Sequence, residues 1–84
     1  MEHKLKEEYP QEFFVELKSN ENFLGRLTVN TDKEGFTCEV DIVQKESRKI
    51  FHHVKILYGL PDKFEAIESG RRKLGQFVQK QDHV

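Results

Sequence analysis

The chain has 84 residues, of which 36% are hydrophobic and 35% charged, and its formal net charge at pH 7 is −1. This composition fits one small domain with a thin core and excludes collagen-like, low-complexity and disordered chains. No run approaches the ~20 apolar residues of a membrane span, and the first residues lack the apolar core of a signal peptide. We therefore expect a cytoplasmic protein with no membrane partner.

The net charge conceals an asymmetry between the two halves of the chain. Residues 1–42 carry five bases and ten acids, whereas residues 43–84 carry nine bases and five acids. The halves therefore have net charges of −5 and +4, and they either cancel within one molecule or attract a second copy. Nucleic-acid binding favours a domain that is basic overall, which this chain is not.

We divide the single domain, residues 1–84, into a lead-in at 1–11, an antiparallel sheet over 12–58 and a helix over 62–81. From Glu12 to Lys18, Phe13, Val15 and Leu17 alternate with a charged set that only Phe14 interrupts, as is typical of a half-buried strand. Residues 19–22 favour a turn, since their Ser and Asn side chains bond to nearby backbone. A second alternating segment, 23–30, then leads to a turn that closes at Gly35.

The third and fourth strands are predicted from residues 36–44 and 50–58. The third has the clearest alternation, and its inner face holds Phe36, Cys38, Val40 and Ile42. We expect Cys38, the one cysteine of the chain, to be a buried and unreactive thiol. The fourth strand is rich in β-branched and aromatic residues and ends at Gly59. Because the three connections are short, the strands form an antiparallel meander.

The period changes after Gly59, where a helix is predicted. Asp62 and Glu65 have the spacing of a capping box at its start. Gly70 lies within the apolar stripe and is expected to let the helix approach the sheet closely. The stripe has spacings of three and four residues and comprises Phe64, Ile67, Leu74, Phe77 and Val78. The fold class is therefore α+β: a four-stranded antiparallel meander with one C-terminal helix packed on one face, ββββα.

One helix covers only one face of such a sheet, so the other face is the candidate interaction surface. Scattered hydrophobic residues on a surface need no special explanation. Alternatively they contact a protein partner or a second copy of the chain, including by addition to an edge strand. The residues assigned to this candidate interaction face are Phe14, Leu24, Val43, Phe51 and Leu57. We expect a small protein-interaction domain that self-associates through this face.

A candidate basic patch supports an alternative function, a nucleic-acid-binding accessory protein. Its residues lie in a loop, a strand and the helix, and they are Lys45, Arg48, Lys49, Lys55, Arg71, Arg72 and Lys73. The helical residues also have a purely structural interpretation. Glu68 precedes Arg71 by three residues and Arg72 by four, a spacing that stabilises helices without any ligand.

We expect no enzymatic activity, no cofactor and no metal site. No serine lies in a nucleophile elbow, and the glycines do not form a phosphate-binding loop. His52 and His53 are adjacent in a strand, so their rings point to opposite faces. We also expect no cysteine or cluster of carboxylates to complete a ligand set around either ring.

The meander followed by Phe64-Glu65-Ala66-Ile67-Glu68-Ser69-Gly70-Arg71-Arg72-Lys73-Leu74 resembles small uncharacterised bacterial proteins of strand-strand-strand-strand-helix layout. Those proteins end in a helix with an acidic first turn, an Ala-aliphatic pair and a Gly-Arg step. The resemblance implies the layout and no assigned activity. Double-stranded-RNA-binding domains also place a final helix on a sheet, but this chain lacks their first helix and has Asp62 and Glu65 where they have basic residues.

Overall fold

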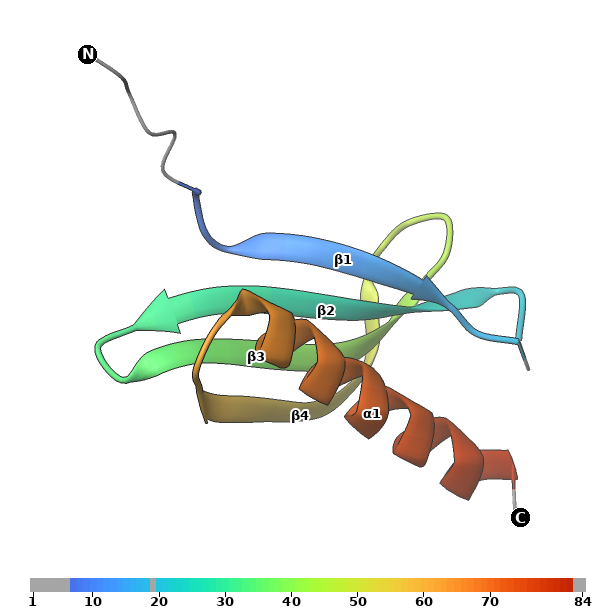
Figure 1. Cartoon of the computed structure of the whole chain (residues 1–84). Coiled ribbons are helices and arrows are strands. Elements are labelled where there is room, and N and C mark those ends of the chain that lie inside the picture. The colour runs from blue at the N-terminus through green and yellow to red at the C-terminus, as the bar shows by residue number, and fades with distance from the viewer. Residues whose placement is uncertain (1–6, 19, 83–84) are drawn as a thin grey trace.

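The computed structural model describes residues 7–18 and 20–82, and in these ranges four antiparallel strands precede one helix. The sheet order is β1-β2-β3-β4, so each strand pairs with its neighbour in the sequence, and α1 lies across one face (Figure 1). This confirms the predicted α+β meander. The elements are β1 (Gln11–Glu16), β2 (Phe23–Asp32), β3 (Gly35–Gln44), β4 (Ile50–Leu60) and α1 (Lys63–Asp82).

The main core lies between α1 and the two central strands. It results from the alternation along β2 and β3, in which every second side chain points toward the helix. Cys38 belongs to this core as predicted, and burial raises the pKa of its thiol to about 11, which leaves it protonated at neutral pH. The buried members of the core are Leu27, Val29, Cys38, Val40, Ile42, Ala66 and Leu74.

The helix begins where the sequence predicts. The backbone N–H of Glu65 donates a hydrogen bond to Asp62 Oδ1 at 2.8 Å, which caps the helix N-terminus. The placement of Phe64 on the apolar stripe is wrong, since Phe64 is 67% exposed. At 3.6 residues per turn, Phe64 lies about a quarter turn from the centre of the stripe, and Ala66 is buried in the first turn instead.

The β3–β4 pairing is irregular. Its register shifts at three places, between Phe36 and Cys38, between Val40 and Asp41, and between Ile42 and Val43. Such irregularities change which face an individual side chain occupies.

Within the described residues, no helix combines the length and the apolar character that a membrane crossing requires.

Gly70 and Gly75 of α1 provide a matched test of the helix packing. A Cβ on Gly70 would come within 2.6 Å of Cys38 Sγ, whereas a Cβ on Gly75 would meet no described atom within 4 Å. We expect Gly70→Ala to lower the free energy of unfolding by about 1–3 kcal/mol through overpacking. Gly75→Ala is expected to raise it by up to about 1 kcal/mol through helix propensity. Urea unfolding measures both, and equal effects of the two substitutions would contradict this packing.

Candidate functional site

A row of charged residues crosses the middle of the sheet on the face opposite α1, here called the open face. Arg26 of β2 pairs with Asp41 of β3, and Asp41 pairs in turn with His53 of β4. Directly opposed residues of antiparallel strands share a face, so these side chains lie side by side. They point away from α1 because Leu27, Val40 and Ile42, their neighbours along β2 and β3, point toward it.

Asp41 is the centre of this row, and its side chain is completely buried. Arg26 Nη2 donates to Asp41 Oδ2 at 3.0 Å, while His53 Nδ1 lies 2.7 Å from Asp41 Oδ1. His53 Nδ1 is also 3.6 Å from Glu39 Oε2. Arg26, Glu39, Asp41 and His53 are referred to below as the Asp41 cluster. Each oxygen of the buried carboxylate therefore has a nitrogen partner, as burial of a charge requires.

The pKa values of the two carboxyl groups in the cluster are shifted in opposite directions. Burial alone would raise the pKa of Asp41, but hydrogen bonds from Glu39, His53 and Arg26, together with the Arg26 charge, hold that pKa below its ordinary value. The pKa of Glu39 is raised, first because its protonated form donates a hydrogen bond to Asp41, and then through burial and repulsion by Asp41. Asp41 is therefore the permanent anion of the cluster.

A second feature of the open face lies at the end of the sheet nearest the β3–β4 loop. In Figure 1 this loop turns up toward β1 instead of extending the sheet. The guanidinium carbon of Arg48 lies 4.7 Å from the centre of the Phe14 ring, and the Lys45 N–H donates to Asn22 O at 2.9 Å. Arg48 has a left-handed backbone with φ of 64°, a conformation that is unfavourable for a residue with a Cβ.

The residues of the candidate interaction face have different positions. Leu24 and Val43 are paired across β2 and β3 on the open face and are buried. Phe14 pairs with Arg26 on the same face and is 43% exposed. Leu57 pairs with Cys38 and therefore lies on the helix-covered side. Phe51 stacks at 4.5 Å on Phe23, which packs against the main core. The irregular pairing of β4 accounts for the last two placements.

The residues of the candidate basic patch do not form one surface. Lys45, Arg48 and Lys49 belong to the loop on the open-face side, whereas Arg71, Arg72 and Lys73 are on the helix that covers the other face. Arg72 Nη2 donates to Ser69 Oγ at 3.1 Å, and Arg71 borders a groove between β1 and α1. Lys55 pairs with Val40 and so lies on the helix-covered side.

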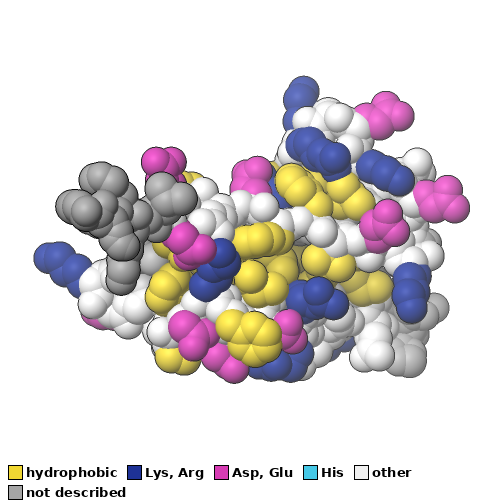
Figure 2. Space-filling view, turned by 45° about the horizontal axis from the view of Figure 1, so that its top comes forward, with side chains coloured by type: hydrophobic (Ala, Val, Ile, Leu, Met, Phe, Trp, Pro, Cys, Tyr) yellow, Lys and Arg dark blue, Asp and Glu magenta, His cyan; other side chains and the backbone are white. Residues whose placement is uncertain are grey.

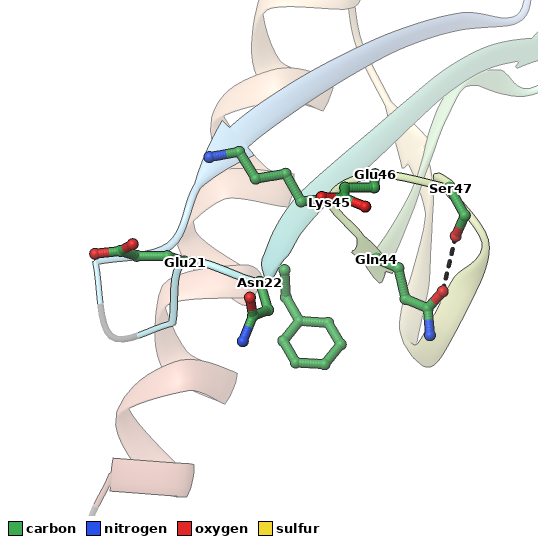
Figure 3. Close-up of a pocket in the computed structure, with 7 residues that line it drawn as sticks. Glu21, Asn22, Gln44, Lys45, Glu46 and Ser47 are labelled. Carbon is green, nitrogen blue, oxygen red and sulfur yellow. Dashed lines mark hydrogen bonds between the residues drawn. The ribbon is translucent and has the colours of Figure 1, made fainter.

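The surface has shallow hollows. One of about 380 Å³ lies between the β1–β2 turn and the β3–β4 loop, where Ser47 Oγ donates to Gln44 Oε1 at 2.7 Å (Figure 3). Another of about 480 Å³ lies between β1 and the second half of α1 and is lined in part by Leu17, Leu74 and Val78. Neither hollow contains a histidine or the cysteine, the residues best suited to nucleophilic or acid–base chemistry.

The sequence reasoning about the two histidines was partly right. Their rings do lie on opposite faces: His52 stacks on Phe77 of α1 at 4.9 Å, while His53 contacts Asp41. The expectation that no carboxylates gather around either histidine was wrong, because Glu39 and Asp41 both approach His53 Nδ1. The signal was present in the sequence, since alternation places Glu39 and Asp41 on one face of a central strand.

No protein-family model, curated protein or solved structure matches this chain.

Removal of the Asp41 charge tests whether the cluster stabilises the fold. We expect Asp41→Asn to lower the free energy of unfolding at pH 7 by about 3 kcal/mol, because it removes the buried anion at 3.0 Å from the mostly buried Arg26 guanidinium and leaves it only the exposed Glu12 carboxylate at 3.7 Å. The control is Asp32→Asn at the exposed end of β2, where an amide oxygen can still accept the Glu34 N–H. Urea unfolding measures both variants, and similar midpoints for the two would refute this role of Asp41.

The raised pKa of Glu39 predicts a stabilising substitution. A carboxyl whose pKa is raised by folding stabilises the folded state when protonated, and this contribution is lost as the pH rises through the folded-state pKa. At pH 7 the ionised Glu39 repels Asp41, so Glu39→Gln is expected to raise the free energy of unfolding by about 0.2–1 kcal/mol. The gain should vanish below about pH 3, more than one unit under the ordinary pKa of a glutamate, where Glu39 is protonated in both states. A variant less stable than wild type at pH 7 would contradict the sign.

Proposed function

We propose that this chain is a protein-interaction domain that forms a homodimer through its open face. The observation that carries the proposal is the exposure of large hydrophobic side chains on that face, where α1 does not reach. Phe14, Ile50 and Tyr58 are 43%, 52% and 67% exposed. Ile50 pairs with Val43 on the open face, and Tyr58 borders a hollow together with Thr28 and Glu39. Aromatic residues are enriched at protein interfaces, where they bury much area with few rotamers.

Charge complementarity favours a second copy as the partner. The β3–β4 loop carries Lys45, Arg48 and Lys49 against Glu46, while the centre of the face carries Glu12, Glu39 and Asp41 against Arg26. The face therefore has a basic end and an acidic centre. A two-fold axis that passes midway between these two regions places the basic loop of each copy opposite the acidic centre of the other.

Exposed hydrophobic and charged side chains both occur on the open face, as they do in protein interfaces that have an apolar core and a polar rim. Figure 2, in which the top of Figure 1 is turned toward the reader, shows the β1 edge and the helix-covered side, where hydrophobic side chains also lie among Lys, Arg, Asp and Glu side chains. A standard interface takes ~800 Å² from each partner. That is about one-eighth of the 6395 Å² of accessible surface on this chain, an area that one face of the sheet can supply.

The oligomeric state tests the proposal. We expect sedimentation equilibrium to find a species of twice 10.0 kDa, and Phe14→Glu to weaken the dimer at least tenfold by placing a charge in the apolar contact. The control is Phe64→Glu. Phe64 is 67% exposed, but it belongs to α1 and lies off the open face. A wild-type chain that remains monomeric at millimolar concentration would overturn the proposal, as would equal effects of the two substitutions.

A charge reversal tests the orientation of the two copies. Lys49→Glu should weaken the dimer, because the loop of each copy then places a negative charge opposite the acidic centre of the other. Adding Glu12→Lys to the same chain should restore part of the affinity, because the reversed loop then faces a reversed charge in that centre. The wild-type dimer should also weaken as salt is raised. Additive losses in the double variant would argue against the two-fold arrangement.

A further inference from the structure

Three side chains of the Asp41 cluster have the donor atoms and spacing of a metal site. His53, Asp41 and Glu39 offer one ring nitrogen and two carboxylate oxygens, and these atoms all lie within 4.8 Å of one another. Two ligands at 2.0–2.1 Å from a tetrahedral ion lie about 3.3 Å apart. The distances of 2.7 Å and 3.6 Å from His53 Nδ1 to the two carboxylates bracket this value.

The groups around these atoms favour a cation. Glu39 and Asp41 contribute two carboxylates to this group, and the single positive charge of Arg26 is shared between Asp41 and Glu12, whose Oε2 lies 3.7 Å from Arg26 Nη1. Arg26 binds Asp41 Oδ2 and leaves Oδ1 directed at His53, so the carboxylate is already oriented. Metal-binding side chains are regularly oriented in this way by a hydrogen bond from a residue that does not itself contact the metal.

Thr28 supplies an independent observation. Its hydroxyl oxygen is buried and has no hydrogen-bond partner among the described residues. Thr28 pairs directly with Glu39 across β2 and β3, on the same open face. A buried hydroxyl without a partner is unfavourable, and a hydrogen bond to a Glu39 carboxylate that turns inward to a metal ion would satisfy it.

The geometry points to a binding site for a divalent transition-metal ion, ligated by His53 Nδ1, Asp41 Oδ1 and Glu39 Oε2. Imidazole with carboxylates suits Zn²⁺ and its neighbours in the first transition row. The ion takes the place of the proton between His53 Nδ1 and Asp41 Oδ1. His53 and Glu39 are 49% and 35% exposed, so the ion enters from solvent and water completes its coordination. All three ligands belong to one chain, and the site does not rest on self-association.

The adjacent histidines provide the matched test. Isothermal titration of the full chain with ZnCl₂ should give saturable binding of one ion, weakened at least tenfold in His53→Gln. His52→Gln should bind within twofold of wild type, because His52 stacks on Phe77 on the other side of the sheet. Both variants retain the same number of histidines. Absence of saturable binding, or equal weakening in the two variants, would overturn the site.

Two further variants separate the site from folding and from self-association. Glu39→Gln, expected to be stably folded, should also lose at least tenfold in Zn²⁺ affinity, and wild-type affinity in this variant would remove Glu39 from the site. Lys49→Glu, in the β3–β4 loop and outside the row that Phe14 shares with Arg26 and Asp41, should weaken the dimer yet bind Zn²⁺ like the wild type, so failure of the dimer and failure of the metal site are distinguishable. In amide NMR spectra of the wild type, shifts should concentrate at residues 39, 41 and 53, and shifts confined to other residues would overturn the assignment.

Discussion

The structure depends on the fact that one helix covers only one face of a four-stranded sheet. On the covered face, the alternation of β2 and β3 builds an ordinary apolar core against α1. Within residues 7–18 and 20–82 no second layer covers the open face, yet Leu24, Val43 and Asp41 on it are buried. The β3–β4 loop folds toward Phe14 at one end, and an ionic network occupies the middle. The open face is therefore where the sequence departs from a simple alternation of apolar and charged residues.

Asp41 joins the three longer strands of the sheet. It binds Arg26 on β2 and His53 on β4, while its own strand, β3, lies between them. A buried carboxylate is stable only with such partners, and an alternative register would separate them, so the cluster favours one alignment of the strands. The same arrangement concentrates carboxylates beside an imidazole. Structural specificity and a capacity for cation binding thus come from the same few side chains.

The open face combines two properties that are physically compatible. Its exposed aromatic and aliphatic side chains are suited to a protein contact, whereas the Asp41 cluster is suited to a small cation. Phe14 on β1 and His53 on β4 lie at opposite ends of one cross-strand row, with Arg26 and Asp41 between them. Substitutions at Phe14 and at His53 therefore address different groups, although both residues belong to one sheet face.

The sequence by itself determined the element order, the meander, the helix cap and the burial of Cys38, because hydrophobic period, turn residues and capping spacing are local signals. Only the tertiary structure decided the positions of Phe51, Leu57 and Phe64 and the grouping of Arg26, Glu39, Asp41 and His53. Irregular pairing in β4 shifts side chains in a way that alternation does not encode. Cross-strand neighbours depend on register, and register is fixed only when the strands pack together.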